Sequence, residues 1–502
     1  MRQVSLRLPA NILVLLCLAS VLVACGKPLP DPLMERSRDT PQWFDDAKLG
    51  IFIHWGPASV PAYAPGKALA PGELEEVLLG TAGRQELPYT EWYSYPLARP
   101  DSSTARYHAA HYGDAPYRDF GPEFERRVNQ SWDPQAWADF FQRVGAHYVV
   151  LVTKHHDGYT LWPSRVPNPH AQGWGSERDM VGELAQAVRA RGLRFGVYYS
   201  TGLDWTFNLV SEGDLVRDML RSAPRGDDYA EYAHAHMLEL IERYSPDVLW
   251  ADIGYPQGGR LDDVLTRYFA AVPDGVVNDR WAALDTIGAI AEWPGTTPVL
   301  KWLARQLISM DDGTLKDDPA RIGFKTEEYN SLAGIPPYKW EATRGLGASF
   351  AFNAAETAQD MLSADELVRF LVDTVAKNGN LLINVGPDSF GQIPAIQQHP
   401  LLGLGEWLRT NGEAVYGRQP WQRFGNLDGR ELRYTSGDGV LYATVFGALD
   451  ERFTLEDPGV AWQALDVLGA NVLQVEKVHD GIEVTLDAAL PGPAAVVRYT
   501  LP

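Results

Sequence analysis

One acidic residue, Asp252, ends an apolar run in which a charged group is costly. The residues from Asp247 to Gly254 are typical of a short buried strand. Alternate side chains of a strand share a face, so Val248, Trp250 and Asp252 point the same way. A carboxylate beside two apolar side chains costs several kcal/mol to keep ionised unless partners compensate it. Such a group serves either chemistry or a buried ion pair.

Other polar residues lie in the equivalent place, at the C-terminal ends of further apolar runs. With Asp252 they are His54, His155, His156, Tyr198, Arg280 and Glu328. Two carboxylates on separate strands, with histidines and aromatic residues around them, fit glycoside hydrolysis. In a retaining enzyme one carboxylate attacks the anomeric carbon, and a second, about 5–5.5 Å away, donates a proton and then activates water. The candidates are Asp252 and one of Glu327 or Glu328, and their neighbours favour chemistry over an ion pair.

The runs that carry these residues recur along the chain. We expect strands over 48–55, 147–156, 194–199, 247–252, 276–280, 323–329, 348–352 and 380–385. Several runs are continuously apolar, which is typical of parallel strands buried on both faces. Helices are expected over 178–191, over 227–244, and over 367–377 after a capping box at Ser363.

Strand and helix alternating about eight times predict an α/β fold with a (β/α)₈-type barrel. Residues around 61–130 and 282–322 are expected to be long loops over one end. From Gly417 the pattern changes to short β runs, which predict a smaller C-terminal β-sandwich domain. We therefore divide the chain into a signal peptide (1–24), a tether (25–41), a (β/α)₈-like catalytic domain (42–416) and a β-sandwich domain (417–502).

The N-terminal residues are typical of an export signal. Arg2 and Arg7 precede an apolar run of twelve residues, which is too short to span a bilayer. The run ends in the sequence Leu-Val-Ala-Cys-Gly, similar to the lipobox of bacterial lipoproteins. We expect an exported bacterial lipoprotein, in the periplasm or at the outer membrane, with a lipid anchor at Cys25. A plain signal peptide is the alternative.

Composition narrows the range of partners. The 502 residues include 16 Trp, 22 Tyr and 17 Phe, an aromatic content that suits stacking against sugar rings. A net charge of −21 argues against a nucleic-acid partner. His155 and His156 would face opposite ways on a strand, and neither an HExxH motif nor a cysteine cluster accompanies them. We therefore predict no metal site and no cofactor.

Eleven segments, in order along the chain, give the sequence a family resemblance. They are Lys48–Gly56, Glu91–Tyr93, Thr153–Gly158, Phe195–Ser200, Gly202–Trp205, Pro246–Asp252, Asn278–Trp281, Lys325–Tyr329, Lys339–Glu341, Ser349–Phe350 and Gly379–Gly386. Together they resemble the α-L-fucosidases of glycoside hydrolase family 29. The resemblance extends from about Gln42 to Arg423. Roughly 40 residues separate Trp281 from Lys325, more than this family leads us to expect.

The resemblance implies a role for each matched residue. Asp252 is implied as the nucleophile and Glu328, in the sequence Lys-Thr-x-Glu-Tyr, as the acid/base. Sugar hydroxyls would be held by His54, Glu91, Trp92, His155, His156 and Tyr198. Arg280 matches an arginine near the nucleophile, and Phe350 an aromatic residue beside the C6 methyl of fucose. Arg280 would keep Asp252 ionised, whereas burial and the charge of Asp252 would keep Glu328 protonated.

The expected function is that of a retaining, exo-acting α-L-fucosidase. It would remove terminal α-L-fucose from fucosylated oligosaccharides or glycoconjugates by double displacement. One alternative is a non-catalytic carbohydrate-binding lipoprotein on the same fold, against which Asp252, Glu328 and Arg280 together argue. Another is a glycosidase for a related sugar such as an α-L-galactoside, which carries a hydroxyl where fucose has its methyl group.

Overall fold

The computed structural model describes residues 39–66, 76, 86–283, 285–302, 322–426, 430–479 and 481–502. The expected signal peptide, Cys25, nearly all of the tether and residues 303–321 lie outside the described residues. None of the helices within the described ranges has the length and apolarity that a membrane span requires.

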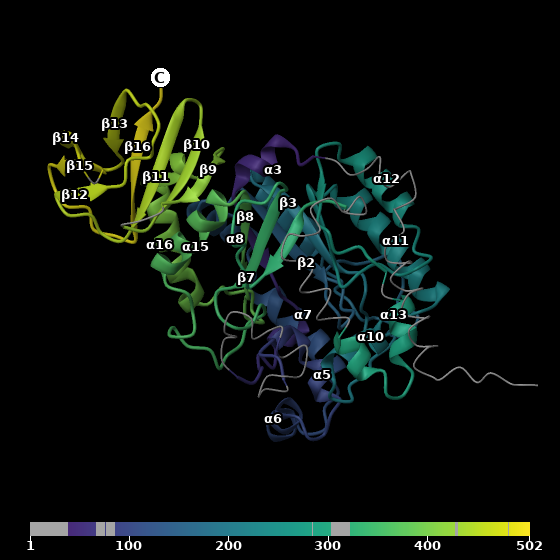
Figure 1. The fold of residues 1–502 in the computed structure, drawn as a ribbon. Helices are drawn as coiled ribbons and strands as arrows, with labels where there is room; N and C mark the ends of the chain where they lie inside the picture. Colours follow the sequence, from purple (N-terminus) through teal and green to yellow (C-terminus); the bar gives the residue numbers. More distant parts are fainter. Residues whose placement is uncertain are drawn as a thin grey trace, which may run out of the picture.

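Eight parallel strands form one sheet at the centre of the larger part of the protein (Figure 1). They are β1 (Leu49–Ile53), β2 (Tyr148–Lys154), β3 (Arg194–Ser200), β4 (Val248–Asp252), β5 (Val276–Val277), β6 (Lys325–Glu328), β7 (Trp340–Gly345) and β8 (Gly379–Val385). Their order is β5-β4-β3-β2-β1-β8-β7-β6, and a parallel bridge between Asn278 and Phe324 joins the two ends. The predicted (β/α)₈-type barrel is therefore confirmed.

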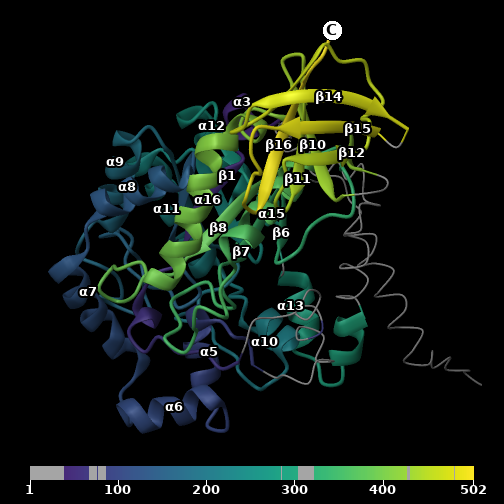
Figure 2. The same cartoon turned by 90° about the vertical axis from the view of Figure 1, so that its left-hand side faces the viewer.

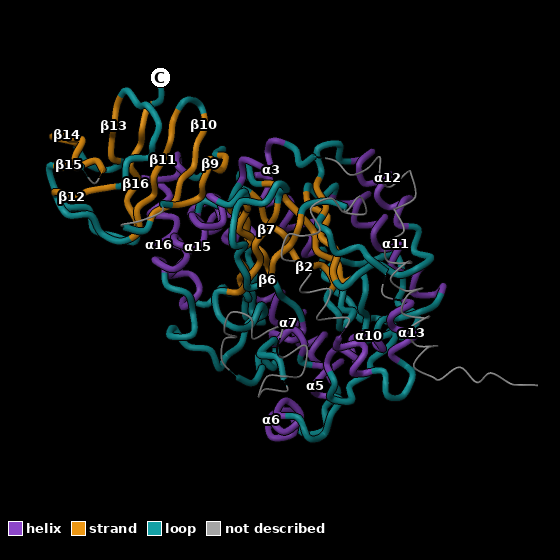
Figure 3. The backbone as a smooth tube through the Cα atoms, in the orientation of Figure 1, coloured by secondary structure: helices purple, strands orange, loops and turns teal. Residues whose placement is uncertain are grey.

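Helices surround the strands, as the tube view shows (Figure 3). Those that cover the barrel wall are α8 (Pro134–Val144), α9 (Met180–Ala190), α11 (Asp227–Tyr244), α12 (Leu261–Ala271), α15 (Ala364–Ala376) and α16 (Ala395–Asn411). The predicted capping box of α15 is present at Ser363. The connection from β6 to β7, residues 329–339, contains no helix, so the βα alternation is irregular there.

The two ends of the barrel carry different additions. At the N-terminal end, α3 (Gln42–Ala47) places Phe44 against the interior side chains Phe52, Tyr148 and Phe324. Further helices lie at the opposite end (Figure 1): α5 (Ser94–Leu97), α6 (Ser103–Tyr112), α7 (Phe120–Ser131), α10 (Leu215–Ser222) and α13 (Asp285–Ala291). The prediction of loops over 61–130 and 282–322 is thus wrong for α5 to α7 and for α13. Apolar residues four apart in α7, Phe120, Phe124 and Val128, explain why that segment is helical.

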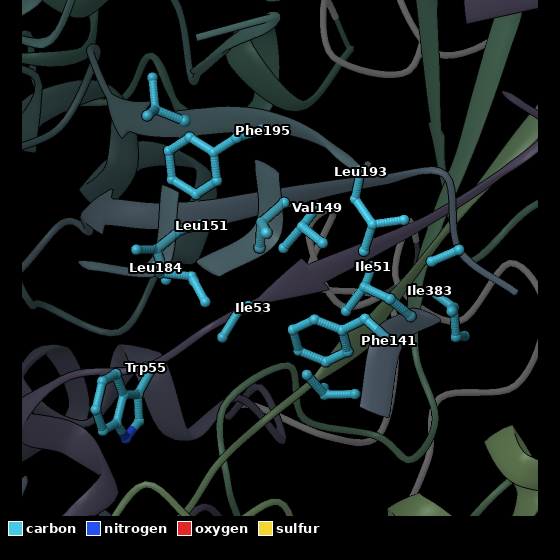
Figure 4. Close-up of a cluster of buried hydrophobic side chains, with 14 of the residues drawn as sticks. Ile51, Ile53, Trp55, Phe141, Val149, Leu151, Leu184, Leu193, Phe195 and Ile383 are labelled. Atoms are coloured by element: carbon cyan, nitrogen blue, oxygen red, sulfur yellow. The ribbon is translucent and has the colours of Figure 1, made fainter. Parts of the chain in front are cut away.

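Apolar packing on both faces fixes the strands. The outward side chains of β1, β2 and β3 meet α8 and α9 in one buried cluster (Figure 4). In that cluster Ile51, Val149 and Phe195 from neighbouring strands lie near Phe141 and Leu184 from the helices. Inward side chains form a second cluster inside the barrel. Because both faces are apolar, the strand-end side chains beyond them are held on a rigid wall.

The C-terminal part consists of two antiparallel sheets beside α15 and α16 (Figure 2). One contains β9 (Gln419–Gly425), β10 (Leu432–Gly437), β11 (Val440–Phe446), β13 (Ala464–Val467) and β16 (Ala494–Thr500). The other contains β12 (Arg452–Leu455), β14 (Val472–Val478) and β15 (Gly481–Leu486). An apolar cluster between them includes Tyr434, Val445, Ile482 and Val497, so the predicted β-sandwich is confirmed.

Two predicted strands differ from the structure. The prediction over 348–352 is wrong, because the seventh strand is β7 and residues 348–352 form a loop. The charged residues Glu341 and Arg344 hid the pattern of β7, although Glu341 is fully buried and accepts hydrogen bonds from Tyr148 and Trp250. The fifth strand is shorter than predicted and stops at Val277, three residues before Arg280.

Candidate active site

One cavity at the C-terminal ends of the barrel strands contains the candidate residues. It encloses about 220 Å³. All ten side chains line it: His54, Glu91, Trp92, His155, His156, Tyr198, Asp252, Arg280, Glu328 and Phe350. Asp252 and Glu328 end strands, and His54 and His155 directly follow strands, whereas Glu91 and Trp92 come from the short helix η2 (Thr90–Trp92).

Asp252 is the last residue of β4 and has 11% of its side chain exposed. The Tyr198 hydroxyl donates to Asp252 Oδ2 at 2.7 Å, and Arg280 Nη1 donates to Oδ1 at 2.9 Å. Burial alone would raise the pKa of Asp252, but the Arg280 charge and these hydrogen bonds outweigh it and lower the pKa below its ordinary value. An ionised carboxylate held in this way is suited to nucleophilic attack.

Glu328 ends β6 and is more exposed, with 24% of its side chain accessible. Arg280 Nη2 donates to Oε2 at 3.2 Å, and the Tyr89 hydroxyl donates to Oε1 at 3.3 Å. Burial raises the pKa of Glu328, Arg280 lowers it, and the charge of Asp252 raises it again, so that it lies above its ordinary value. The pKa values of the two carboxyls are therefore moved apart, as a base and an acid require.

A single guanidinium links the two carboxyls. Arg280 donates to Asp252 from Nη1 and to Glu328 from Nη2, and its planar group lies 4.9 Å over the Trp250 ring. Because both nitrogens belong to one small planar group, the two carboxyls lie close together on the same side of the cavity. A close pair suits the retaining arrangement better than the wider spacing of inverting glycosidases.

The neighbouring acid, Glu327, faces away from the cavity. Its Oε1 pairs with Lys325 Nζ at 2.8 Å, and its Oε2 accepts from Asn330 Nδ2 at 3.3 Å. Alternation along β6 places Lys325 and Glu327 on one face, and Thr326 and Glu328 on the other. Glu328 is accordingly the member of this pair that lines the cavity.

Buried histidines line the cavity in their neutral form. Burial lowers the pKa of His54 to about 4 and that of His156 to about 3, and it holds the pKa of His155 well below the usual value. Nδ1 of His54 lies 2.7 Å from Asn384 Oδ1, so this nitrogen carries the proton and Nε2 is an acceptor. His156 Nε2 lies 4.0 Å from Asp252 Oδ2. These rings can therefore hydrogen-bond sugar hydroxyls without adding charge.

The expectation that His155 and His156 face opposite ways is wrong. Both line the cavity, with ring centroids 4.0 Å apart. The register between β2 and β3 shifts between Val152 and Lys154, and β2 ends there, so strand alternation does not extend to the histidines. Within the described ranges no three or more His, Cys, Asp or Glu side chains are grouped as metal ligands.

Glu91 and Phe350 reach the cavity from two loops that hold each other. Glu91 Oε2 accepts from the backbone of Ala351 at 2.9 Å and from Ser349 Oγ at 3.3 Å. Burial raises the pKa of Glu91 to about 8, so this carboxyl is protonated at neutral pH and can donate a hydrogen bond. The Phe350 ring packs against His54 with centroids 4.8 Å apart. The loop is thus fixed from both sides.

The comparison with known proteins agrees with this geometry. The family model for alpha-L-fucosidase matches residues 29–413. The chain belongs to the alpha-L-fucosidase family. It is similar to the alpha-L-fucosidase of Dictyostelium discoideum, with 32% identity over 476 residues that cover 91% of this chain and 88% of that protein. The tissue alpha-L-fucosidase of Homo sapiens is 31% identical over 453 residues, covering 87% and 83%.

A solved structure extends the likeness to the fold. The Thermotoga maritima alpha-fucosidase crystallised in complex with fucose is 35% identical and aligns with a TM-score of 0.74, covering 94% of this chain and 99% of that chain. The family resemblance seen in the sequence is therefore confirmed over the barrel and extends into the C-terminal sheets.

Several residues of this alpha-L-fucosidase family member line the cavity without having been predicted as site residues. They are Phe52, Leu87, Tyr89, Met219, Trp250, Ile253 and Thr343. Strand alternation could have identified Phe52 and Trp250, which precede His54 and Asp252 by two positions. Tyr89 comes from a loop, where no periodic pattern indicates direction, and Met219 comes from α10, a helix that was not predicted.

Proposed function

We propose that this protein is a retaining, exo-acting α-L-fucosidase that hydrolyses terminal α-L-fucose from glycans or glycoconjugates. The observation that carries the proposal is the arrangement around Arg280, which holds two carboxyls whose pKa values are moved in opposite directions. Membership of the alpha-L-fucosidase family and a cavity of about 220 Å³ at the strand ends support an enzyme that binds one terminal sugar.

In the first step Asp252 is the nucleophile and Glu328 the acid. The ionised Asp252 oxygen forms a bond to the anomeric carbon while the bond from that carbon to the departing oxygen breaks. Glu328 gives its proton to the departing oxygen, so the aglycone leaves as a neutral alcohol. After this step Glu328 is ionised and Asp252 is esterified. The positive charge of Arg280 therefore lies beside whichever of the two carboxyls is ionised.

In the second step water replaces the aglycone. Glu328 takes a proton from the water, whose oxygen attacks the anomeric carbon, and the ester bond to Asp252 breaks. Two inversions at one carbon give net retention. Both carboxyls return to their initial protonation states, because Glu328 regains the proton that it donated.

The apolar side of the cavity supports fucose over related sugars. Phe52, Trp250 and Phe350 line it, and Phe350 is 6% exposed. An apolar pocket binds a methyl group well but rejects a hydroxyl at the same place only by about 10²-fold. We therefore expect an aryl α-L-fucoside to be cleaved faster than the matching α-L-galactoside by no more than about that ratio.

The test uses Asp252→Gly. It should abolish turnover of aryl α-L-fucosides while the protein keeps the melting behaviour of the wild type, because no other group can form the covalent intermediate. Added azide fits the space of the lost side chain and should restore part of the rate, giving a β-fucosyl azide. Near wild-type hydrolysis without azide would refute the role of Asp252, and a wild-type protein without turnover would favour a carbohydrate-binding function.

We also propose that the protein is an exported lipoprotein anchored to a membrane through Cys25. The support is the N-terminal sequence alone, because Cys25 lies outside the described residues. The variant Cys25→Ala should leave the membrane fraction, since the anchor would be a lipid on that sulfur. Unchanged fractionation of the variant with membranes would contradict this proposal.

A further inference from the structure

The junction between β5 and β6, called the seam below, is the weakest in the barrel, and catalytic side chains meet beside it. Strand β5 has only two residues, and its link to β6 is the bridge between Asn278 and Phe324, with Phe324 N donating to Val277 O at 3.0 Å. Arg280 and Glu328 both lie beyond that bridge. Backbone pairing between β5 and β6 therefore does not fix the distance between these two side chains.

A chain of side-chain hydrogen bonds spans the seam instead. Asp279 Oδ1 accepts from the backbone nitrogen of Thr326 at 3.1 Å and from its hydroxyl at 2.8 Å. The same hydroxyl oxygen accepts from Arg280 Nε at 3.0 Å. A hydroxyl has one proton, and here Asp279 receives it, so the lone pairs of the Thr326 oxygen face Arg280. Thr326 is 9% exposed, which limits competition from solvent.

We propose that Thr326, oriented by Asp279, is a positioning residue that sets the guanidinium of Arg280 between Asp252 and Glu328. This inference rests on the proposed function. Arg280 has three contact points, and Thr326 holds the one at Nε. With Nε fixed, Nη1 and Nη2 are directed to Asp252 and Glu328.

The Trp250 ring alone cannot provide this orientation. It lies 4.9 Å beneath the guanidinium. Contact with a ring face fixes the height of a planar cation but allows it to turn within its own plane. Loss of the Thr326 acceptor would therefore let Arg280 turn away from the carboxyls while it stays on the indole.

By orienting the Arg280 charge, Thr326 thus affects the pKa of both carboxyls. Arg280 lowers the pKa of Asp252 and that of Glu328. The other titratable groups that face the pair, all but Tyr329 from segments other than that of Thr326, keep their own contacts when Thr326 changes. They are His54, His156 and Tyr198 around Asp252, and Tyr89, Glu91 and Tyr329 around Glu328.

The experiment compares Thr326→Val with Thr326→Ser. Valine keeps the shape and the backbone N–H but removes the acceptor, whereas serine keeps the hydroxyl. For Thr326→Val we expect kcat/KM on an aryl α-L-fucoside to fall about 10- to 100-fold. Both limbs of its pH profile should move to higher pH, by about one unit, because both carboxyls lose part of the Arg280 charge. The serine variant should restore the wild-type limbs.

Each result either supports or refutes the positioning role of Thr326. A purely structural role for Thr326 would reduce the rate or the melting temperature without moving the limbs, and unmoved limbs in Thr326→Val overturn the proposal. A serine variant as impaired as the valine variant overturns it too. If the valine variant does not fold, Thr326→Ala is measured in the same way. The proposed function is judged separately, by wild-type turnover and its loss in Asp252→Gly.

Discussion

The sharpest test of the site compares two adjacent glutamates. Glu328→Ala removes the carboxyl that lines the cavity and contacts Arg280 Nη2 at 3.2 Å. Glu327→Ala removes the same atoms one residue earlier, from a side chain that pairs with Lys325 at 2.8 Å on the opposite face of β6. The two substitutions are chemically identical, so any difference in kinetics reports which face of the strand carries the acid.

General acid catalysis sets the size of the expected effect. A positioned acid contributes about 10²–10⁴-fold, which corresponds to about 2.7–5.4 kcal/mol of transition-state stabilisation. The full loss is expected only when the departing oxygen is a poor leaving group, as in natural fucosides. Asp252 keeps its contacts with Tyr198 and Arg280 in Glu328→Ala, so it stays ionised and can still attack. An activated aryl fucoside should therefore undergo the first step with little loss.

The second step then limits the aryl reaction, because no base is left to activate water. Stopped-flow measurements on Glu328→Ala should show a burst of aryl alcohol equal to the enzyme concentration, followed by slow turnover. Mass spectrometry of the intact protein should detect a fucosyl adduct. Glu327→Ala should show neither the burst nor the leaving-group dependence. If Glu327→Ala shows both and Glu328→Ala neither, the acid has been assigned to the wrong face of β6.

Three further predictions concern pH and stability. The folded state raises the pKa of Glu91 from 4.5 to about 8, so the stability that Glu91 contributes is complete below its unfolded pKa and is lost as the pH rises through about 8. The melting temperature of the wild type should therefore fall relative to that of Glu91→Gln as the pH rises from 4.5 to about 8. Melting temperatures that change in parallel would contradict the raised pKa of Glu91. Asp204→Ala leaves Lys154 without its fully buried partner at 2.8 Å. It should lower the free energy of unfolding in urea by about 3–5 kcal/mol, and a loss below about 1 kcal/mol would show that Lys154 is readily neutralised. Tyr198→Phe removes a hydrogen bond that favours ionised Asp252 and should move the acid limb of the kcat/KM profile to higher pH. An unmoved limb would mean that Arg280 alone keeps Asp252 ionised.

The sequence predicts the parts of the site that follow from strand periodicity. Val248, Trp250 and Asp252 alternate along an apolar run, and this pattern is sufficient to place Asp252 at the end of a buried strand. The family resemblance selects Glu328 over Glu327, and the same rule places these two side chains on opposite faces of β6. It works because packing on both faces of β4 and β6 leaves each side chain only two directions.

The predictions fail where tertiary contacts decide the conformation. Glu341 and Arg344 make β7 resemble a surface segment, yet Tyr148 and Trp250 satisfy the buried Glu341 carboxylate. Both partners are far from it in the sequence, so no local pattern could reveal them. Tyr89 reaches Glu328 from a loop whose course depends on Ser349, which accepts a hydrogen bond from the Thr90 backbone.

The opposite roles of Asp252 and Glu328 follow from an asymmetry around one cation. Arg280 contacts both carboxyls, so its charge cannot by itself make one a nucleophile and the other an acid. The other donors differ: Asp252 accepts from the Tyr198 hydroxyl at 2.7 Å and from the Ile253 backbone at 3.0 Å, whereas the Tyr89 hydroxyl lies 3.3 Å from Glu328. The carboxylate with the closer donors is the one that holds its charge, although it is the less exposed of the two, and that charge then disfavours ionisation of its neighbour. Burial raises the pKa of both carboxyls, and it prevails at Glu328, whereas the Arg280 charge and the close Tyr198 donor on β3 outweigh it at Asp252.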